Sequence, residues 1–287
     1  RNRMSEYKKA LLAVSFGTSY TQVIESCIAP VEQAMAAAAP GYDLFRAFTS
    51  GMIIKKLKNV CHMEISTPQE ALEALAQMGY KTVAVLPTHI LAGTEYHNLE
   101  RDTEGFAKDH PEIMVSLGQP LLYENDDYSQ VARALGQWMP KTGDREVVLL
   151  MGHGTEHFSN SSYFALQHYL DQLPTRAVYV ANVEAPPVLD EVMDRMEKEG
   201  VKKVYLMPFM LVAGDHARND MAGDDEDSWY NILTRRGFSV EIILHGLGES
   251  EDFRRLYANK ARKLIRTMGD GDFGLALKPE SFNVLDS

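Results

Sequence analysis

Several features are scarce or missing in this 287-residue sequence, and each absence narrows the choice of function. Cysteine occurs only as Cys27 and Cys61, without the spacing of a metal or redox motif. No apolar run reaches the roughly 18 residues that a membrane helix needs. Neither GxxxxGK[ST] nor a GxGxxG that follows a strand is present, so we expect no nucleotide. Positive charge is in deficit, with 29 Lys and Arg against 40 Asp and Glu, which argues against nucleic-acid and anionic-membrane partners.

What the sequence does contain is an alternation of apolar, β-rich runs with segments of helical period. This alternation is typical of βαβ units around parallel sheets. We expect an α/β fold of two similar doubly wound domains, 1–140 and 141–287, separated by a cleft, because 287 residues exceed one core. A terminal helix at about 250–268 could pack back on the first domain. The expected strands are 10–15, 43–48, 82–87 and 113–117, then 147–151, 177–183, 203–208 and 240–244.

Helix punctuation supports this division into elements. Thr67 has the chemistry of an N-cap, Pro68 suits the first helical position, and Glu70 is placed as a capping-box acid. Gly79 is expected to end the same helix.

An internal repeat indicates that the two halves are copies of each other. Residues 79–95 align without gaps onto residues 200–216, with matching glycines, lysines, prolines and Ala-Gly pairs. The alignment places Glu95 opposite His216. The strand-ending segments Ser-Phe-Gly-Thr at 15–18 and Gly-His-Gly-Thr at 152–155 also correspond, which places Phe16 opposite His153.

Imidazoles and carboxylates follow several of the expected strands. His153, Glu184 and His216 do so in the second half, and His89 and Glu95 in the first. Ligands of open parallel sheets bind beyond the carboxyl ends of the strands, so these groups could converge on one cleft. Imidazole with carboxylate suits Co²⁺, Ni²⁺, Fe²⁺ or Zn²⁺. The alternative for each single histidine is an ordinary hydrogen bond within its loop.

Other residues are candidates for binding an anionic substrate. The turns that contain Gly17, Thr18 and Gly154 can present backbone N–H groups to anions. Candidate partners for substrate carboxylates, beside Phe16 and His89 at the same edge, are Arg46, Ser50 and Arg218.

Two further histidines lie close to the expected cleft. His97 could ligate haem or another metal, against the alternative of a surface role. His157 follows His153 by four residues, but the glycine at 154 argues against a helical metal pair, so we expect His157 to be a solvated first-turn residue.

At these residues the sequence resembles the anaerobic cobalt chelatases of the CbiK type, within the class II chelatases. The resemblance spans residues 8 to about 265. It is carried by 9–20 (KALLAVSFGTSY), 43–52 (DLFRAFTSGM), 151–154 (MGHG), 206–217 (LMPFMLVAGDHA), 219–222 (NDMA) and 227–229 (DSW). One departure is THILAGT at 88–94, where the family pattern is closer to LHIINGD.

The resemblance implies a two-domain chelatase fold with a site for a sirohydrochlorin-type tetrapyrrole. It implies metal-binding roles for His153 and His216, and cleft carboxylates at Glu95 and Glu184. The catalytic candidates are then His153, His216 and Glu95, and the metal ligands His153, Glu184 and His216.

The expected function is ATP-independent insertion of Co²⁺ into sirohydrochlorin, or into precorrin-2, for cobalamin biosynthesis. Ni²⁺ and Fe²⁺ stay open as substrates, as does the oligomeric state. The rival classes are a bilobal metal, tetrapyrrole or haem carrier without turnover, and a metal-dependent hydrolase. The sequence starts at Arg1, which is compatible with a removed signal peptide, so we expect either a cytoplasmic or a periplasmic location.

Overall fold

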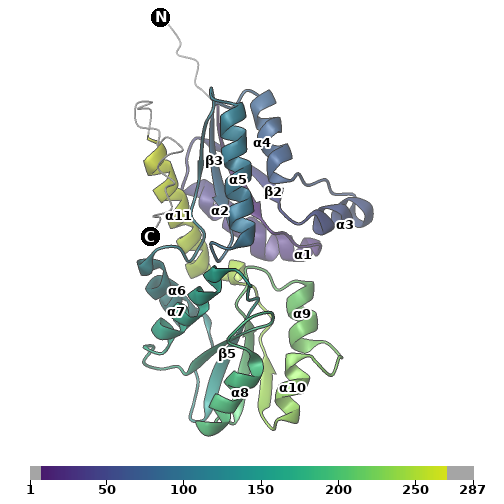
Figure 1. Ribbon diagram of the computed structural model, residues 1–287, viewed down its shortest axis with the longest axis vertical. Helices are drawn as coiled ribbons and strands as arrows, with labels where there is room; N and C mark the ends of the chain where they lie inside the picture. Colours follow the sequence, from purple (N-terminus) through teal and green to yellow (C-terminus); the bar gives the residue numbers. More distant parts are fainter. Residues whose placement is uncertain (1–7, 270–287) are drawn as a thin grey trace, which may run out of the picture.

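Two four-stranded parallel sheets form the centres of two lobes stacked along the long axis of the molecule (Figure 1). The computed structural model describes residues 8–269, apart from the side chains of Asp215 and His216. The first sheet has the order β2-β1-β3-β4 and the second the order β6-β5-β7-β8. The predicted α/β fold with two doubly wound parallel sheets is confirmed. The strands are β1 (Lys9–Ser15), β2 (Tyr42–Phe48), β3 (Thr82–Pro87), β4 (Met114–Leu117), β5 (Glu146–Gly152), β6 (Val178–Asn182), β7 (Lys203–Pro208) and β8 (Ser239–Ile242).

All eight predicted strands are observed, with ends that differ by at most two residues. Long apolar runs made them recognisable, because β1, β3 and β5 are covered by helices on both faces and are buried almost throughout.

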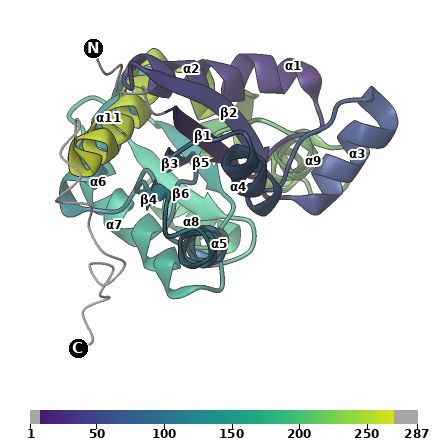
Figure 2. The same cartoon turned by 90° about the horizontal axis from the view of Figure 1, so that it is seen from above.

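Helices cover both faces of each sheet (Figures 1 and 2). In the first half they are α1 (Thr21–Val23), the π-helix η1 (Ile24–Ile28), α2 (Ala29–Ala37), α3 (Gly51–Cys61), α4 (Pro68–Gln77), α5 (Thr94–Asp109) and α6 (Asn125–Trp138). In the second half they are the 3₁₀ helix η2 (Phe158–Asn160), α7 (Ser161–Leu170), α8 (Leu189–Lys198), α9 (Asp215–Ala222), α10 (Trp229–Arg235), the 3₁₀ helix η3 (Leu247–Glu249) and α11 (Glu251–Met268). The described residues contain no helix that is both long and apolar enough to cross a membrane.

The predicted start of α4 is confirmed. The Thr67 hydroxyl accepts a hydrogen bond from the Glu70 backbone N–H at 3.2 Å, and Pro68 occupies the first turn. Gly79 follows the helix with a φ of +87°, in the left-handed region that glycine adopts at low cost.

The strand registers support the internal repeat. In the first lobe Lys9 pairs with Thr82 and Val14 with Pro87. In the second lobe, Glu146 pairs with Lys203 and Met151 with Pro208. Each pair of the second lobe is the image of a pair of the first under the sequence alignment, so the equivalence of Glu95 with His216 and of Phe16 with His153 has a structural basis.

The lobes exchange their last helices. Figure 1 shows α11 beside α2 in the first lobe, whereas α6 lies with α7 in the second. One hydrophobic core runs through this exchange: Leu135 of α6, Phe253 and Tyr257 of α11, and Val148 of β5 are all buried in it. The predicted division at residue 140 falls between α6 and β5 and stays a prediction.

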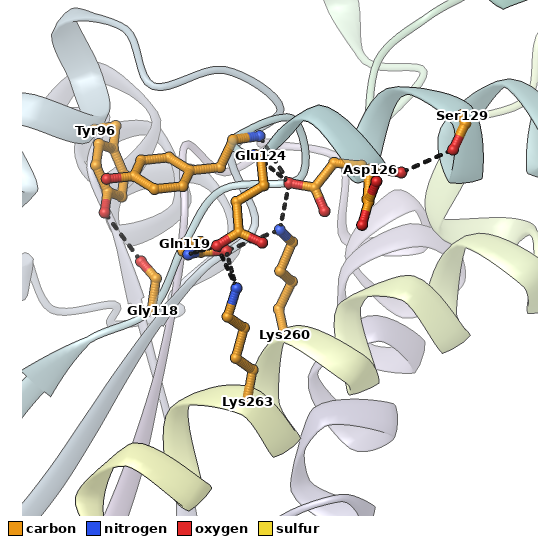
Figure 3. Close-up of polar contacts among 10 residues, drawn as sticks. Tyr96, Gly118, Gln119, Glu124, Asp126, Ser129, Lys260 and Lys263 are labelled. Atoms are coloured by element: carbon orange, nitrogen blue, oxygen red, sulfur yellow. Dashed lines mark hydrogen bonds and ion pairs between the residues drawn. The ribbon is translucent and has the colours of Figure 1, made fainter.

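A polar network fastens the exchanged helices to each other (Figure 3). Lys260 of α11 contacts Asp127 of α6 at 2.7 Å, with side chains only 9% and 12% exposed. Lys260 Nζ also donates to Gln119, while Lys263 Nζ contacts Glu124 at 2.5 Å.

Candidate active site

His153 and Glu184 form an imidazole–carboxylate pair at the carboxyl edge of the second sheet. His153 follows β5 directly, and its Nδ1 lies 3.5 Å from Glu184 Oε2. The Glu184 backbone N–H donates to the His153 carbonyl at 3.0 Å, so the two residues are tied through both main chain and side chain. The side chains are 52% and 61% exposed, which leaves both open to a ligand.

The loop conformation directs the ring nitrogens of His153. Nδ1 lies 3.2 Å from the Gly154 carbonyl oxygen. Nδ1 is therefore close to both the Gly154 carbonyl and the Glu184 carboxylate, and these contacts orient the imidazole at the end of β5. Gly154 has a φ of +78°, and a Cβ there would lie 2.9 Å from the Ala185 backbone nitrogen, so the turn requires glycine.

Gly154 itself is less available to an anion than the sequence predicts. Its N–H donates to the hydroxyl of buried Tyr163 at 3.3 Å. Burial raises the pKa of Tyr163, which keeps that hydroxyl neutral. A role for the Gly154 N–H in substrate binding therefore stays a prediction that would require exchange of this bond.

Glu95 and His216 occupy equivalent places at the starts of equivalent helices. α5 has Gly93 as N-cap and Glu95 as its second residue, and α9 has Gly214 as N-cap and His216 as its second residue. Glu95 is exposed, and its negative charge is favoured by the positive end of the helix dipole. The backbone of His216 is described within α9, whereas its side chain lies outside the described part of the structure.

Phe16 stands at the first-lobe position equivalent to His153 and is 47% exposed. The turn that presents it is tightly constrained, because Gly17 has a φ of +104° and a Cβ there would lie 2.6 Å from the Phe48 ring. The buried Thr18 hydroxyl accepts from the Tyr20 N–H at 3.3 Å, and the Ser50 N–H donates to the Phe16 carbonyl at 3.2 Å. An exposed aromatic ring on a fixed turn suits contact with a flat apolar ligand.

Ser50 caps the N-terminus of α3. Its hydroxyl accepts from the Ile53 N–H at 3.3 Å. The predicted substrate contact of Ser50 is therefore combined with a local structural role.

His89 is buried more deeply than the sequence indicates. The residue as a whole is partly exposed, but both ring nitrogens are inaccessible and neither has a hydrogen-bond partner among the described residues. Burial lowers the pKa of His89 to about 4, so the ring is neutral at pH 7. Contact with a substrate would require this side chain to move, and its predicted binding role stays a prediction.

The two candidate arginines already have protein partners. Arg46 makes a bidentate ion pair with the buried carboxylate of Glu32, at 2.9 Å from Nε and 2.5 Å from Nη2. Arg218 donates from Nε to the Ala213 carbonyl at 3.2 Å, and its guanidinium lies 5.3 Å from the centre of the Tyr20 ring. Recognition of substrate carboxylates by either arginine stays a prediction.

His97 and His157 contact each other, which the sequence does not indicate. Their ring centroids are 5.1 Å apart. His157 is the N-cap of η2 and is partly buried, and its Nδ1 accepts from the Ser159 N–H at 3.0 Å, so the prediction of a solvated first-turn residue is wrong. Burial, with a smaller contribution from His97, lowers the pKa of His157. His97 Nδ1 lies 3.3 Å from Glu100, and its predicted affinity for haem stays a prediction.

No group of three His, Cys, Asp or Glu side chains with metal-binding geometry occurs among the described residues. A metal ion held at the His153–Glu184 pair would therefore need further ligands from outside this described pair, and the metal-binding roles of His153, Glu184 and His216 stay predictions. A cavity of about 220 Å³ lies elsewhere, between α6 and α11. The lysines that line this cavity already contact Asp127, Gln119 and Glu124, so we do not assign the cavity to the substrate.

Comparison with known proteins places this geometry in a family. At 44% identity over 252 residues, covering 87% of this chain and 94% of the relative, the chain is similar to the sirohydrochlorin cobaltochelatase of Salmonella typhimurium. It is 31% identical over 265 residues to the sirohydrochlorin cobaltochelatase CbiKC of Nitratidesulfovibrio vulgaris, covering 92% of this chain and 93% of the relative.

Solved structures support the fold. SirB from Bacillus subtilis with Fe³⁺ matches with a TM-score of 0.63 at 17% identity, over 90% of this chain and 95% of that one. SirB from Bacillus subtilis subspecies spizizenii in complex with cobalt matches with a TM-score of 0.62 at 15% identity, over 93% and 98%. The family model described as cobalt chelatase (CbiK) matches residues 9–266, and the chain belongs to this family.

Proposed function

We propose that this chain inserts Co²⁺ into sirohydrochlorin, as an ATP-independent metal chelatase of cobalamin biosynthesis. The observation that carries the proposal is the accessible His153–Glu184 pair at the carboxyl edge of a duplicated chelatase fold, in a chain 44% identical to a sirohydrochlorin cobaltochelatase. Cobalt is the substrate metal, and Ni²⁺ and Fe²⁺ are candidates for the same site. The tetrapyrrole is sirohydrochlorin, with precorrin-2 as the alternative.

Metal binding is the first task of the site. His153 offers an imidazole and Glu184 a carboxylate, a combination of nitrogen and oxygen ligands that suits Co²⁺. We assign the third protein ligand to His216, at the start of α9. An incomplete protein shell leaves coordination positions for the ring nitrogens, which then replace the protein ligands one by one.

Proton removal is the second task, since a neutral ring must lose two pyrrole protons to bind a dication. Each N–H bond gives its proton to a base, its electron pair stays on nitrogen, and that pair binds the metal. The exposed carboxylate of Glu95 and the imidazoles that the metal has left are the acceptors in this scheme. No redox change or nucleotide is needed for the balance, because two protons leave as one Co²⁺ enters.

Absorbance spectroscopy tests the proposal directly. Purified protein mixed with sirohydrochlorin and Co²⁺ should convert the free-ring spectrum to that of the cobalt complex far faster than the protein-free mixture. Added ATP should leave the rate unchanged, and parallel assays with Ni²⁺ and Fe²⁺ rank the metals. A carrier would bind both ligands but give no time-dependent metallation above the protein-free rate, and that result would refute the proposal.

His216→Ala tests the assignment on α9. Insertion should fall on the order of 10²–10⁴-fold, as expected when a positioned acid–base or metal-handling group is removed. His168→Ala is the matched control, because His168 lies on α7 and contacts only Gln172 and the neighbouring Tyr169 ring in the described structure. Near-normal turnover of His216→Ala would reject the role of this histidine.

A further inference from the structure

Two contacts between the lobes involve residues that follow the candidate site residues closely in the sequence. In one, the Arg218 guanidinium of α9 lies over the Tyr20 ring of the first lobe, 5.3 Å from its centre. In the other, His97 of α5 packs against His157 of the second lobe, with centroids 5.1 Å apart. We call these the Tyr20–Arg218 contact and the His97–His157 contact.

The two contacts are equivalent. Each joins a helix of one lobe to a loop of the other lobe, and the lobes exchange these roles between the two contacts. Arg218 follows His216 by two residues, as His97 follows Glu95, and both pairs lie in the first turns of equivalent helices. Tyr20 follows Phe16 by four residues, as His157 follows His153, in the loops after the equivalent strands β1 and β5. In each case a helix whose second residue is a site candidate touches the other lobe through the side chain two positions further on.

The backbone is close to the opposite lobe at the same two places. A Cβ at Gly214, the N-cap of α9, would lie 3.4 Å from Thr18 Oγ1, and a Cβ at Gly93, the N-cap of α5, would lie 3.2 Å from Ser159 Oγ. The start of each helix is therefore held near the loop of the other lobe by packing as well as by its aromatic contact.

We infer that the Tyr20–Arg218 contact is a positioning device that holds the first turn of α9, and with it His216, at a fixed distance from the opposite lobe. Neither Tyr20 nor the Arg218 guanidinium touches the metal in this scheme; they act through the helix. Because His216 is assigned a metal ligand, this inference rests on the proposed function.

The structure explains why α9 needs such a contact. The helix has only eight residues, and Ala217 and Met221 are its side chains in the hydrophobic core of the second lobe. Arg218 ties its own helix to the preceding loop through the Ala213 carbonyl while it covers the Tyr20 ring, so one side chain joins loop, helix and opposite lobe.

Steady-state kinetics with a double-mutant cycle test the inference. Tyr20→Ala and Arg218→Gln should each raise the KM for Co²⁺ about two- to fivefold, the fold-change that an exposed cation–π contact corresponds to, with little change in the KM for sirohydrochlorin. The double variant should be no worse than either single variant, because both remove the same interaction. Tyr20→Phe keeps the aromatic face that Arg218 covers, so it should raise the KM for Co²⁺ less than Tyr20→Ala does.

Lys203→Gln is the matched control. It removes the cation from another cation–π contact, 4.4 Å from the Tyr205 ring, on the strand that precedes α9. Lys203 lies at the amino end of β7, away from the candidate site, so both KM values should stay unchanged.

Other outcomes would overturn the inference. A rise in the KM for sirohydrochlorin in Arg218→Gln, with normal kinetics in Tyr20→Ala, would show that Arg218 binds substrate carboxylates directly. Additive effects in the double variant would show that the two residues act separately. Equilibrium dialysis of Co²⁺ against the substrate-free variants is a readout independent of turnover. An inactive wild type would refute the proposed function, whereas unchanged Co²⁺ affinity in Tyr20→Ala would refute the positioning role.

Discussion

In the first lobe β1 leads into Phe16, and in the second lobe the equivalent strand β5 leads into His153. The lobes differ in the same way after the next pair of equivalent strands, where Glu95 is the second residue of α5 and His216 is the second residue of α9. Since the β1–β3 and β5–β7 registers match, these differences are not due to geometry. The two lobes share one backbone arrangement and differ in the side chains at these positions. The second lobe carries the imidazoles of His153 and His216 together with Glu184, and the first lobe carries the exposed ring of Phe16 and the carboxylate of Glu95.

The largest effect is expected when this difference is erased. His153→Phe makes the second lobe carry the residue of the first at this position. It removes the imidazole, so cobalt insertion should fall on the order of 10²–10⁴-fold. The measurement is the initial rate of absorbance change at saturating sirohydrochlorin and Co²⁺, with His168→Phe as control. Retention of more than about a tenth of the wild-type rate would remove His153 from the mechanism.

The next effect concerns the helices that the lobes exchange. Asp127→Asn removes the charge opposite Lys260, whose side chain is only 9% exposed. Burial already lowers the pKa of Lys260, and the Asp127 carboxylate opposes that shift. Loss of one partner of a buried ion pair should cost about 3 kcal/mol in the free energy of unfolding, at the low end of the usual range because some water reaches the pair.

Urea unfolding measures this cost. Arg236→Gln, which removes exposed ion pairs to Asp194 and Glu197, should change the midpoint little. An Asp127→Asn variant as stable as Arg236→Gln would mean that the Lys260 network does not hold the exchanged helices together.

The sequence predicts the repeated parts of this molecule better than the connections between them. The strands follow from apolar runs bounded by glycine and proline, and the equivalence of Glu95 with His216 follows from a gap-free alignment. The sequence does not reveal the partner of Arg46, because Glu32 is brought to it only when α2 packs on β2. The His97–His157 and Tyr20–Arg218 contacts are equally hidden, since each depends on how the lobes meet.

His89 gives a smaller, pH-dependent effect. Its equivalent in the second lobe is Met210, so His89→Met makes the lobes alike at this position. Burial lowers the pKa of His89 from 6.5 to about 4, so between these values the unfolded chain binds a proton that the folded chain does not. The stability of the wild type should therefore fall by about 2 kcal/mol between pH 7.5 and pH 5 through this residue.

Urea unfolding at both pH values tests the difference between wild type and His89→Met. The variant should lose about 2 kcal/mol less on acidification, whatever its stability at pH 7.5. Equal losses in both proteins would mean that His89 takes up a proton in the folded state near its ordinary pKa.

The smallest effect concerns one tyrosine hydroxyl on each of the two exchanged helices. Tyr257 of α11 donates to the Thr88 carbonyl at 2.8 Å in the fully buried core of the first lobe, and Tyr128 of α6 donates to Ser162 at 2.9 Å in a partly buried place in the second. Tyr257→Phe should cost about 1–2 kcal/mol of unfolding free energy, because water cannot reach the freed carbonyl. Tyr128→Phe should cost about 0.5 kcal/mol, since water can replace its hydroxyl. Urea unfolding of both variants decides the order, and a larger cost for Tyr128→Phe would show that α6, rather than α11, depends more on its hydroxyl contact with the lobe it joins.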